Sequence, residues 1–103
     1  MVVALTTFFV SRHPGSLAWA KSRGVQWDQA VPHLDVAQVQ PGDHVYGTLP
    51  VPMAAAVCAK GAEYWHLQLP VVHGDRGREL TADELSERGA CFIHFEVKQM
   101  KAA

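Results

Sequence analysis

The sequence predicts an α/β fold, with a mainly parallel sheet and helices on both of its faces. Along the 103 residues, segments with the composition of strands alternate with segments of helical periodicity, which is typical of parallel sheets. The first strand segment is almost continuously apolar, as in a strand covered on both faces. Because 49% of the residues are apolar, residues 1–103 can form one core, and we expect a single Rossmann-like domain.

The first half of the chain begins with a strand at Val2–Val10, which is rich in β-branched and aromatic residues. Gly15–Arg23 carries an apolar stripe at helical spacing, which predicts a helix. Residues 27–39 show no clear period and receive no assignment. After the turn signal Pro41-Gly42-Asp43, a second strand is predicted at His44–Leu49.

The second half of the chain continues the alternation. A helix is predicted at Pro52–Lys60, where the proline fits the first turn, and a third strand at Glu63–Leu69. Thr81 and Glu84 have the spacing of a capping box, which predicts the start of a third helix. The last strand, Cys91–Val97, alternates in polarity. We therefore expect it at an edge of the sheet, where it could run antiparallel.

The composition argues against several classes of function. The formal net charge is −1, whereas general nucleic-acid binders carry a basic excess, so no duplex DNA or RNA partner is expected. No apolar run approaches the ~20 residues that span a bilayer, and Met1–Leu5 lacks the basic start of a signal peptide. We therefore expect a cytoplasmic protein without a membrane partner.

The sequence predicts neither a metal site nor a cofactor. His33, Asp35 and His44, together with His13, are conceivable ligands, but their spacings match no helical or zinc-ribbon pattern. The phosphate-binding motifs GxGxxG and GxxxxGK(S/T) are absent, as is the GxSxG nucleophile elbow. A dinucleotide or nucleoside triphosphate enzyme is therefore not expected.

Polar residues follow the predicted strands at their carboxyl ends, where open α/β sheets bind ligands. These segments are Ser11-Arg12-His13, Gly47-Thr48-Leu49-Pro50, and the loop with Arg76 and Arg78. The first of them leads into a helix, so that backbone N–H groups and the positive end of the helix dipole are expected to gather there. Guanidinium, imidazole and hydroxyl groups together suit an anionic ligand, above all a phosphodiester.

Each of these side chains also has a purely structural alternative. Arg12 could pair with a surface carboxylate, and His13 could cap the helix that follows it. Ser11 could bond backbone rather than a ligand, and Thr48 could be a turn residue. The two loop arginines could be solvated. The residues alone leave these alternatives open.

Several short motifs occur in the same order as in a known family, and they cover the chain from about Phe8 to Val97. The sequence resembles a small CRISPR-associated family of the Csx group, found with type III CRISPR systems. The motifs are Phe9-Val10-Ser11-Arg12-His13-Pro14-Gly15, His33-Leu34-Asp35, Pro41-Gly42-Asp43, Gly47-Thr48-Leu49-Pro50, Lys60-Gly61-Ala62 and Arg76-Gly77-Arg78-Glu79-Leu80. The resemblance implies a stand-alone ring nuclease that degrades a cyclic oligoadenylate, above all cyclic tetra-adenylate. It also implies a fold similar to CARF sensor domains, and a homodimer.

The residues and the resemblance together predict a metal-independent reaction in which a ribose 2′-hydroxyl attacks the adjacent phosphorus. Arg12 is expected to stabilise charge on the phosphate, and His13 to act as acid or base. Ser11 and Thr48 would orient the phosphate oxygens or the 2′-hydroxyl. Gly47, Leu49 and Pro50 would shape the binding turn, and Arg76 or Arg78 would close over the ring.

Three other functions remain compatible with the sequence. The protein could be a sensor or sponge that binds the same messenger without cutting it. It could be a small phosphoesterase or phosphosugar-binding protein, or a structural subunit whose polar loops are merely solvated. The sequence also leaves open the preferred ring size, and whether Ser11-Arg12-His13 cuts the ring or only holds it.

Overall fold

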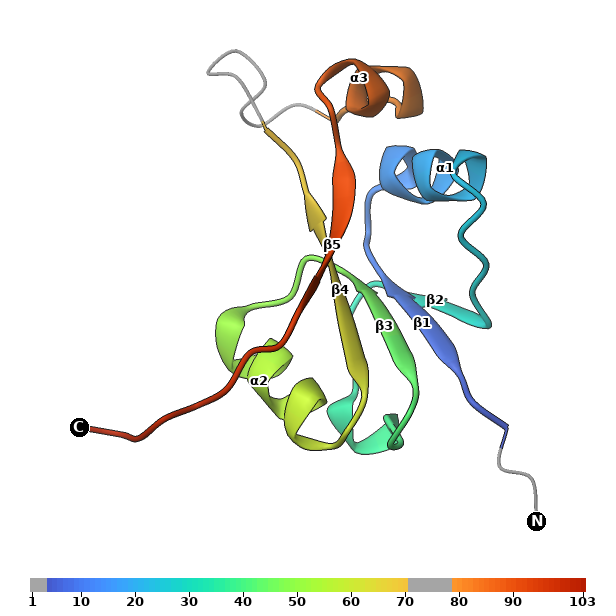
Figure 1. Cartoon of the computed structure of the whole chain (residues 1–103). Coiled ribbons are helices and arrows are strands. Elements are labelled where there is room, and N and C mark those ends of the chain that lie inside the picture. The colour runs from blue at the N-terminus through green and yellow to red at the C-terminus, as the bar shows by residue number, and fades with distance from the viewer. Residues whose placement is uncertain (1–3, 71–78) are drawn as a thin grey trace.

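The computed structural model describes residues 4–70 and 79–103. These residues form a five-stranded sheet in the order β2-β1-β3-β4-β5 (Figure 1). The first four strands are parallel, and β5 runs antiparallel to β4 at the edge. The mainly parallel sheet and the edge position of the last strand are therefore confirmed. The strands are β1 (Thr7–Val10), β2 (Gln29–Val31), β3 (His44–Gly47), β4 (Glu63–Gln68) and β5 (Cys91–Phe95).

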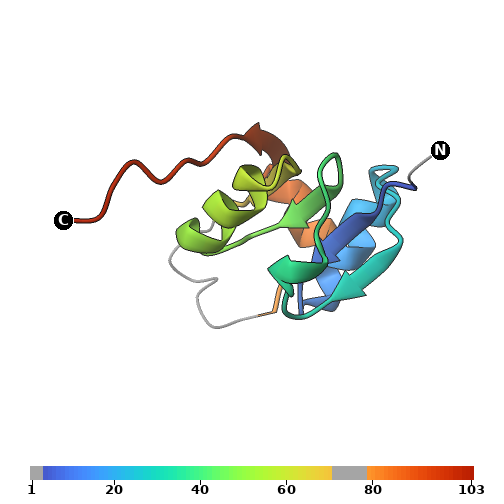
Figure 2. The same ribbon diagram turned by 90° about the horizontal axis from the view of Figure 1, so that it is seen from below.

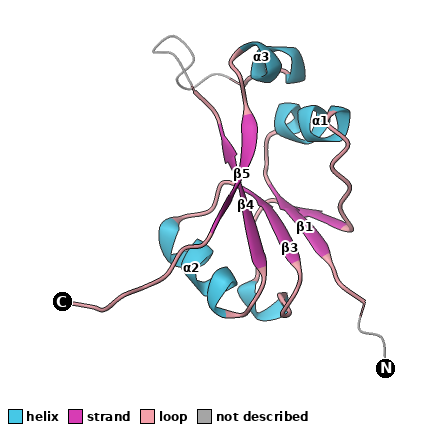
Figure 3. Cartoon of the chain, in the orientation of Figure 1, coloured by secondary structure: helices cyan, strands magenta, loops and turns pink. Residues whose placement is uncertain are grey.

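Helices cover both faces of the sheet, as predicted (Figure 3). Alternate side chains of β1 enter two separate clusters: Phe8 packs with residues of α2, and Phe9 packs with residues of α1 and α3. Beyond β5 the last residues of the chain extend away from the sheet (Figure 2). The helices are α1 (Pro14–Ser22), α2 (Val51–Ala59) and α3 (Ala82–Glu87).

The start of β1 differs from the prediction, because the strand begins at Thr7 rather than at Val2. The strand begins where a partner becomes available: Thr7 is paired with His44, the first residue of β3. Just before it, the Thr6 N–H donates to the Asp43 carboxylate at 2.9 Å. Asp43 is 1% exposed and directly precedes β3, so its buried carboxylate holds the residue before β1 next to the start of β3.

The segment 27–39, which has no clear period, contains the short edge strand β2 and a 3-10 helix at Val36–Gln38. Strand β2 pairs in parallel with β1. It has three residues, two of them exposed, so its side chains carry no apolar alternation that a sequence pattern could reveal. Its position places Pro32 and His33 beside the carboxyl end of β1.

The first turn of α1 packs closely against the chain that leads into α3. A Cβ added at Gly15 would overlap the Leu80 backbone carbonyl oxygen. We expect Gly15→Ala to destabilise the protein by about 1–3 kcal/mol through this overlap, although alanine favours a helix by about 1 kcal/mol over glycine. The free energy of unfolding in urea measures the effect. Ala18 of the same helix is exposed and serves as a control: here Ala18→Gly should be less stable than wild type, because only helix propensity acts. If Gly15→Ala proves more stable than wild type, so that alanine is preferred at both positions, the packing argument is contradicted.

Candidate functional site

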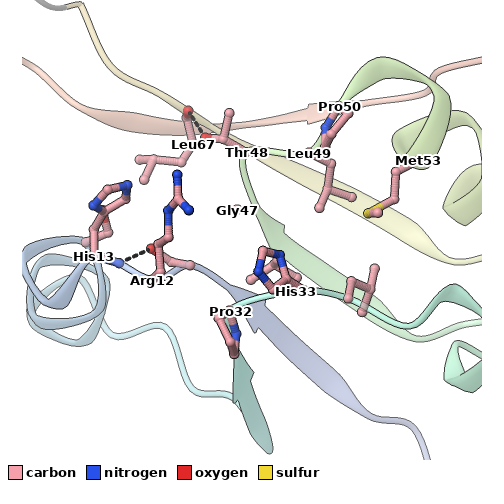
Figure 4. A pocket seen from close by; sticks show the side chains of 14 residues that line it. Arg12, His13, Pro32, His33, Gly47, Thr48, Leu49, Pro50, Met53 and Leu67 are labelled. Atoms are coloured by element: carbon pink, nitrogen blue, oxygen red, sulfur yellow. Dashed lines mark hydrogen bonds between the residues drawn. The ribbon is translucent and has the colours of Figure 1, made fainter. Parts of the chain in front are cut away.

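A pocket of about 430 Å³ lies at the carboxyl ends of the parallel strands (Figure 4). Two segments that the sequence singles out line it together: Ser11-Arg12-His13, which follows β1, and Gly47-Thr48-Leu49-Pro50, at the end of β3. They meet because β1 and β3 are neighbours in the sheet and run parallel. The volume lies within the range of small-molecule sites in proteins.

The turn after β1 is held by its own backbone. The Ser11 N–H donates to the Val31 carbonyl oxygen at 3.0 Å, and the His13 N–H donates to the Ser11 hydroxyl oxygen at 3.1 Å. The Ser16 N–H donates to the His13 carbonyl oxygen at 3.1 Å, and Pro14 has no N–H. The N–H groups of Ser11, His13 and Ser16 are therefore already bonded, and only part of the expected N–H gathering is left for an anion beside the side chains.

The Arg12 side chain is exposed and extends into the pocket between His13 and Gly47 (Figure 4). Within residues 4–70 and 79–103, no carboxylate forms an ion pair with it. Pairing with a surface carboxylate, the structural alternative for this arginine, is thus not observed in the described part of the chain. An unneutralised guanidinium in a pocket attracts an anionic ligand.

His13 is held by a carboxylate from a distant part of the chain. Its Nδ1 lies 2.9 and 3.0 Å from the two carboxylate oxygens of Glu79. His13 occupies the N-cap position of α1, but its side chain makes no capping hydrogen bond, so the capping alternative is wrong. Because an ionised carboxylate only accepts hydrogen bonds, Nδ1 is the nitrogen that donates to Glu79. In the neutral imidazole, Nε2 is then left to accept a hydrogen bond.

The loop after β3 is fixed from the neighbouring strand β4. The Tyr64 hydroxyl accepts the Leu49 N–H at 2.9 Å, and it lies 3.3 Å from the Gly47 carbonyl oxygen and 2.6 Å from His66 Nδ1. The Thr48 hydroxyl donates to the Leu67 carbonyl oxygen at 3.2 Å. This donor is therefore occupied, as expected for a turn residue, and Thr48 can still accept a hydrogen bond from a ligand.

Removal of the Tyr64 hydroxyl should loosen this loop. We expect Tyr64→Phe to lower the free energy of unfolding by about 1–2 kcal/mol, because the Leu49 N–H loses its partner. Burial raises the pKa of Tyr64, and the Leu49 hydrogen bond opposes that rise. Because its pKa is raised, the folded state holds the Tyr64 proton more tightly than the unfolded state does. The contribution of the protonated hydroxyl to the free energy of unfolding is therefore complete below pH 10, the ordinary tyrosine value. It is lost as the pH rises through the raised pKa.

Urea unfolding of wild type and Tyr64→Phe at neutral and alkaline pH measures both effects. The difference in unfolding free energy between the two proteins should narrow above about pH 10. Tyr46 offers a matched control, because its hydroxyl makes no hydrogen bond in the described part of the chain. If Tyr46→Phe costs as much as Tyr64→Phe at neutral pH, the hydroxyl of Tyr64 does not anchor the loop.

Further residues line the pocket that the sequence analysis did not place there. Pro32 and His33 come from the end of β2, and Met53 comes from α2. No sequence pattern signals β2, because two of its three residues are exposed, so the sequence does not place Pro32 and His33 at this edge of the sheet. Arg76 and Arg78, the predicted loop arginines, lie outside the described residues; Glu79, which holds His13, follows them directly in the sequence.

No group of three or more His, Cys, Asp or Glu side chains within the described residues is placed to hold a metal ion. His33, Asp35 and His44 therefore do not gather into one site. In the same part of the chain, no helix has the length and apolar character needed to cross a membrane.

Comparison with known proteins adds one assignment. The family described as "Putative CRISPR-associated protein (Cas_VVA1548)" matches residues 8–98, so the match includes all of the sheet except Thr7 and both described segments of the pocket. No curated protein and no solved structure matches the chain. Because the match covers most of the 103 residues, the chain belongs to this family of CRISPR-associated proteins.

Proposed function

We propose that the protein is a ring nuclease that binds and cleaves a cyclic oligoadenylate messenger of type III CRISPR defence, above all cyclic tetra-adenylate. The observation that carries the proposal is the pair Arg12 and His13 in one pocket. Arg12 has no ion-pair partner in the described part of the chain, and His13 is oriented by Glu79. A cation beside an imidazole can supply the charge stabilisation and the proton transfer that metal-independent cleavage of a phosphodiester needs. Membership of a CRISPR-associated family supports a role in antiviral defence.

The proposed reaction uses the chain's own side chains. The ribose 2′-oxygen attacks the adjacent phosphorus in line, and its proton passes to His13 Nε2. The bond between phosphorus and the 5′-oxygen breaks, and the 5′-oxygen takes a proton from solvent. The products are a 5′-hydroxyl and a 2′,3′-cyclic phosphate. Arg12 stabilises the negative charge that grows on the phosphate oxygens.

We propose that the active form is a homodimer in the cytoplasm. A cyclic tetra-adenylate has rotational symmetry, and a two-fold dimer can present one Arg12 pocket to each half of the ring. A single pocket of about 430 Å³ has room for part of such a ring. The mass of the protein in solution, alone and with the ring, tests the dimer.

A second candidate, a sensor or sponge that does not cut, also has support. The Ser11 hydroxyl accepts the His13 N–H, and the Thr48 hydroxyl donates to a backbone carbonyl. Both hydroxyl groups are therefore partly engaged with the backbone. They are less free to align the attack of a 2′-hydroxyl on the phosphorus, whereas holding a ligand demands less precise geometry.

The Glu79 carboxylate gives a first test of the proposed mechanism. We expect Glu79→Gln to lower the turnover of cyclic tetra-adenylate about 10-fold, because the amide orients the imidazole without stabilising its charged form. His13→Ala should cost more, about 100-fold or above. Glu87→Gln on α3 is the matched control, since Glu87 is exposed and pairs at 4.0 Å with Arg88, outside the pocket; its turnover should equal that of wild type. Equal activity of Glu79→Gln and wild type would show that the contact between His13 and Glu79 has no part in the mechanism.

Incubation of the protein with cyclic tri-, tetra- and hexa-adenylate, without added metal, tests the function itself. Linear products from the tetra-adenylate ring are expected. Recovery of intact ring from a tight complex would instead establish the sensor or sponge. Cleavage of linear but not cyclic substrates would indicate a general phosphoesterase. If no ring raises the melting temperature, the protein does not bind this messenger, as expected of a structural subunit.

A further inference from the structure

The pocket has a second end that differs in chemistry from the Arg12 end. Figure 4 shows the His33 ring and the Leu49 side chain pointing toward one another across the pocket, with Met53 beside Leu49. These three side chains come from the end of β2, the loop after β3, and α2. They form what we call the apolar slot. Arg12 lies on the other side of Gly47 (Figure 4).

The groups of the apolar slot suit the faces of a flat ring. In the described part of the chain, His33 makes no hydrogen bond or ion pair, and its side chain is exposed to the pocket. Planar side chains such as imidazole stack on nucleobases, and a methionine thioether makes favourable contacts with aromatic rings. Leu49 is 7% exposed and offers a fixed apolar wall.

Gly47 connects the apolar slot to the Arg12 end. It has no side chain, and a Cβ at this position would meet the Val10 carbonyl oxygen. Gly47 lines the pocket, and without a side chain it places no group between the two ends. One ligand can reach both ends if it has an anionic group and an aromatic ring joined by a short polar linker. A nucleotide has this form, with its phosphate and its base joined by the ribose.

We propose that the apolar slot is a purine-base site, in which the base lies between His33 and Leu49 while its phosphate lies at Arg12. The identity of the base as adenine rests on the proposed function. The site itself requires only that the ligand be a purine nucleotide. His33 is then a specificity-determining residue that contacts the base, with no part in the transfer of protons.

Nuclear magnetic resonance of the methyl-labelled protein with adenosine 5′-monophosphate tests the placement. Adenine protons should show nuclear Overhauser effects to the Met53 methyl group and to the Leu49 methyl groups. Ribose 5-phosphate, which has the phosphate but no base, should bind about 10-fold more weakly than the nucleotide, because base stacking is lost. Equal affinity for the two ligands, or contacts from adenine to another part of the protein, would overturn the proposal, as would failure of the nucleotide to bind at millimolar concentration.

Two variants of His33 separate stacking from other roles. His33→Ala should weaken binding of the nucleotide about 10-fold and leave ribose 5-phosphate unchanged. His33→Phe keeps a flat ring but has no ring nitrogen, and should bind the nucleotide within about 3-fold of wild type. If both variants lose affinity for ribose 5-phosphate, His33 contacts the phosphate and the proposal is wrong. His33 is exposed, so both variants should fold.

The outcome for the base site is independent of the outcome for cleavage. If the nucleotide binds with the expected contacts while cyclic tetra-adenylate is left intact, the purine-base site is supported and the nuclease proposal is wrong. If the ring is cut while adenine contacts a different part of the protein, the nuclease proposal is supported and the purine-base site is wrong.

Discussion

Arg12→Ala should reduce the turnover of cyclic tetra-adenylate by about 100- to 1000-fold, the cost of losing one group that stabilises charge in a transition state. The Arg12 guanidinium extends into the pocket and has no carboxylate partner in the described part of the chain. Its charge is therefore available to the phosphate. Single-turnover rates at saturating enzyme measure the loss in the chemical step, separately from any loss of affinity.

Two further variants control this result. Arg12→Lys keeps the charge but loses the two-pronged guanidinium geometry, so an intermediate rate is expected. Arg23→Gln removes an arginine of similar exposure at the other end of α1, where the guanidinium lies 5.5 Å from the centre of the Trp19 ring. This variant should cleave the ring at the rate of wild type. A full rate in Arg12→Ala, or an equal loss in Arg23→Gln, would show that Arg12 has no special role.

Gly47→Ala should destabilise the protein by about 2–4 kcal/mol and remove its ligand binding. Two costs add here. The backbone of Gly47 has a φ of 140°, which strains an L-residue by roughly 1–3 kcal/mol. The new Cβ would also meet the Val10 carbonyl oxygen of the adjacent strand, and relief of that overlap must move β1 or β3 at the floor of the pocket.

Gly24→Ala separates these two costs. Gly24 also has a positive φ, 83°, but a Cβ there would have no neighbour within 4 Å. We expect Gly24→Ala to cost about 1–2 kcal/mol and to leave ring cleavage unchanged. Urea unfolding and the turnover assay, performed on both variants, measure the difference. If the two substitutions lower the free energy of unfolding by the same amount and both leave turnover unchanged, the close approach of β1 and β3 at Gly47 does not matter for the site.

Most of the fold was predictable because its signals are local. The apolar strand that ends at Val10, the capping box of Thr81 and Glu84, and the polar–apolar alternation of the last strand each act through neighbouring residues. Strand β2 was not predictable, because its three residues pair with β1 through the backbone while their side chains are largely exposed. The start of β1 depends on where β3 begins, and this is a tertiary property.

The candidate site was predictable where it follows from topology. Parallel strands end at one edge of a sheet, so the segments after β1 and β3 meet in the pocket. The contact between His13 and Glu79 spans 66 positions of the sequence, and no local pattern signals it. His33 was missed as a pocket residue together with β2. The backbone bonds of Ser11 and Thr48 also needed coordinates, since hydroxyl groups bond backbone and ligands equally well.

The most direct test of the central claim is the mass of the product formed from cyclic tetra-adenylate in EDTA and ¹⁸O-labelled water. Attack by the ribose 2′-hydroxyl opens the ring without adding water. The first product should therefore have the mass of the intact ring, carry a 2′,3′-cyclic phosphate and contain no ¹⁸O. A first product that has gained labelled water, or a ring that stays intact in EDTA, would contradict metal-independent cleavage by the Arg12–His13 pocket.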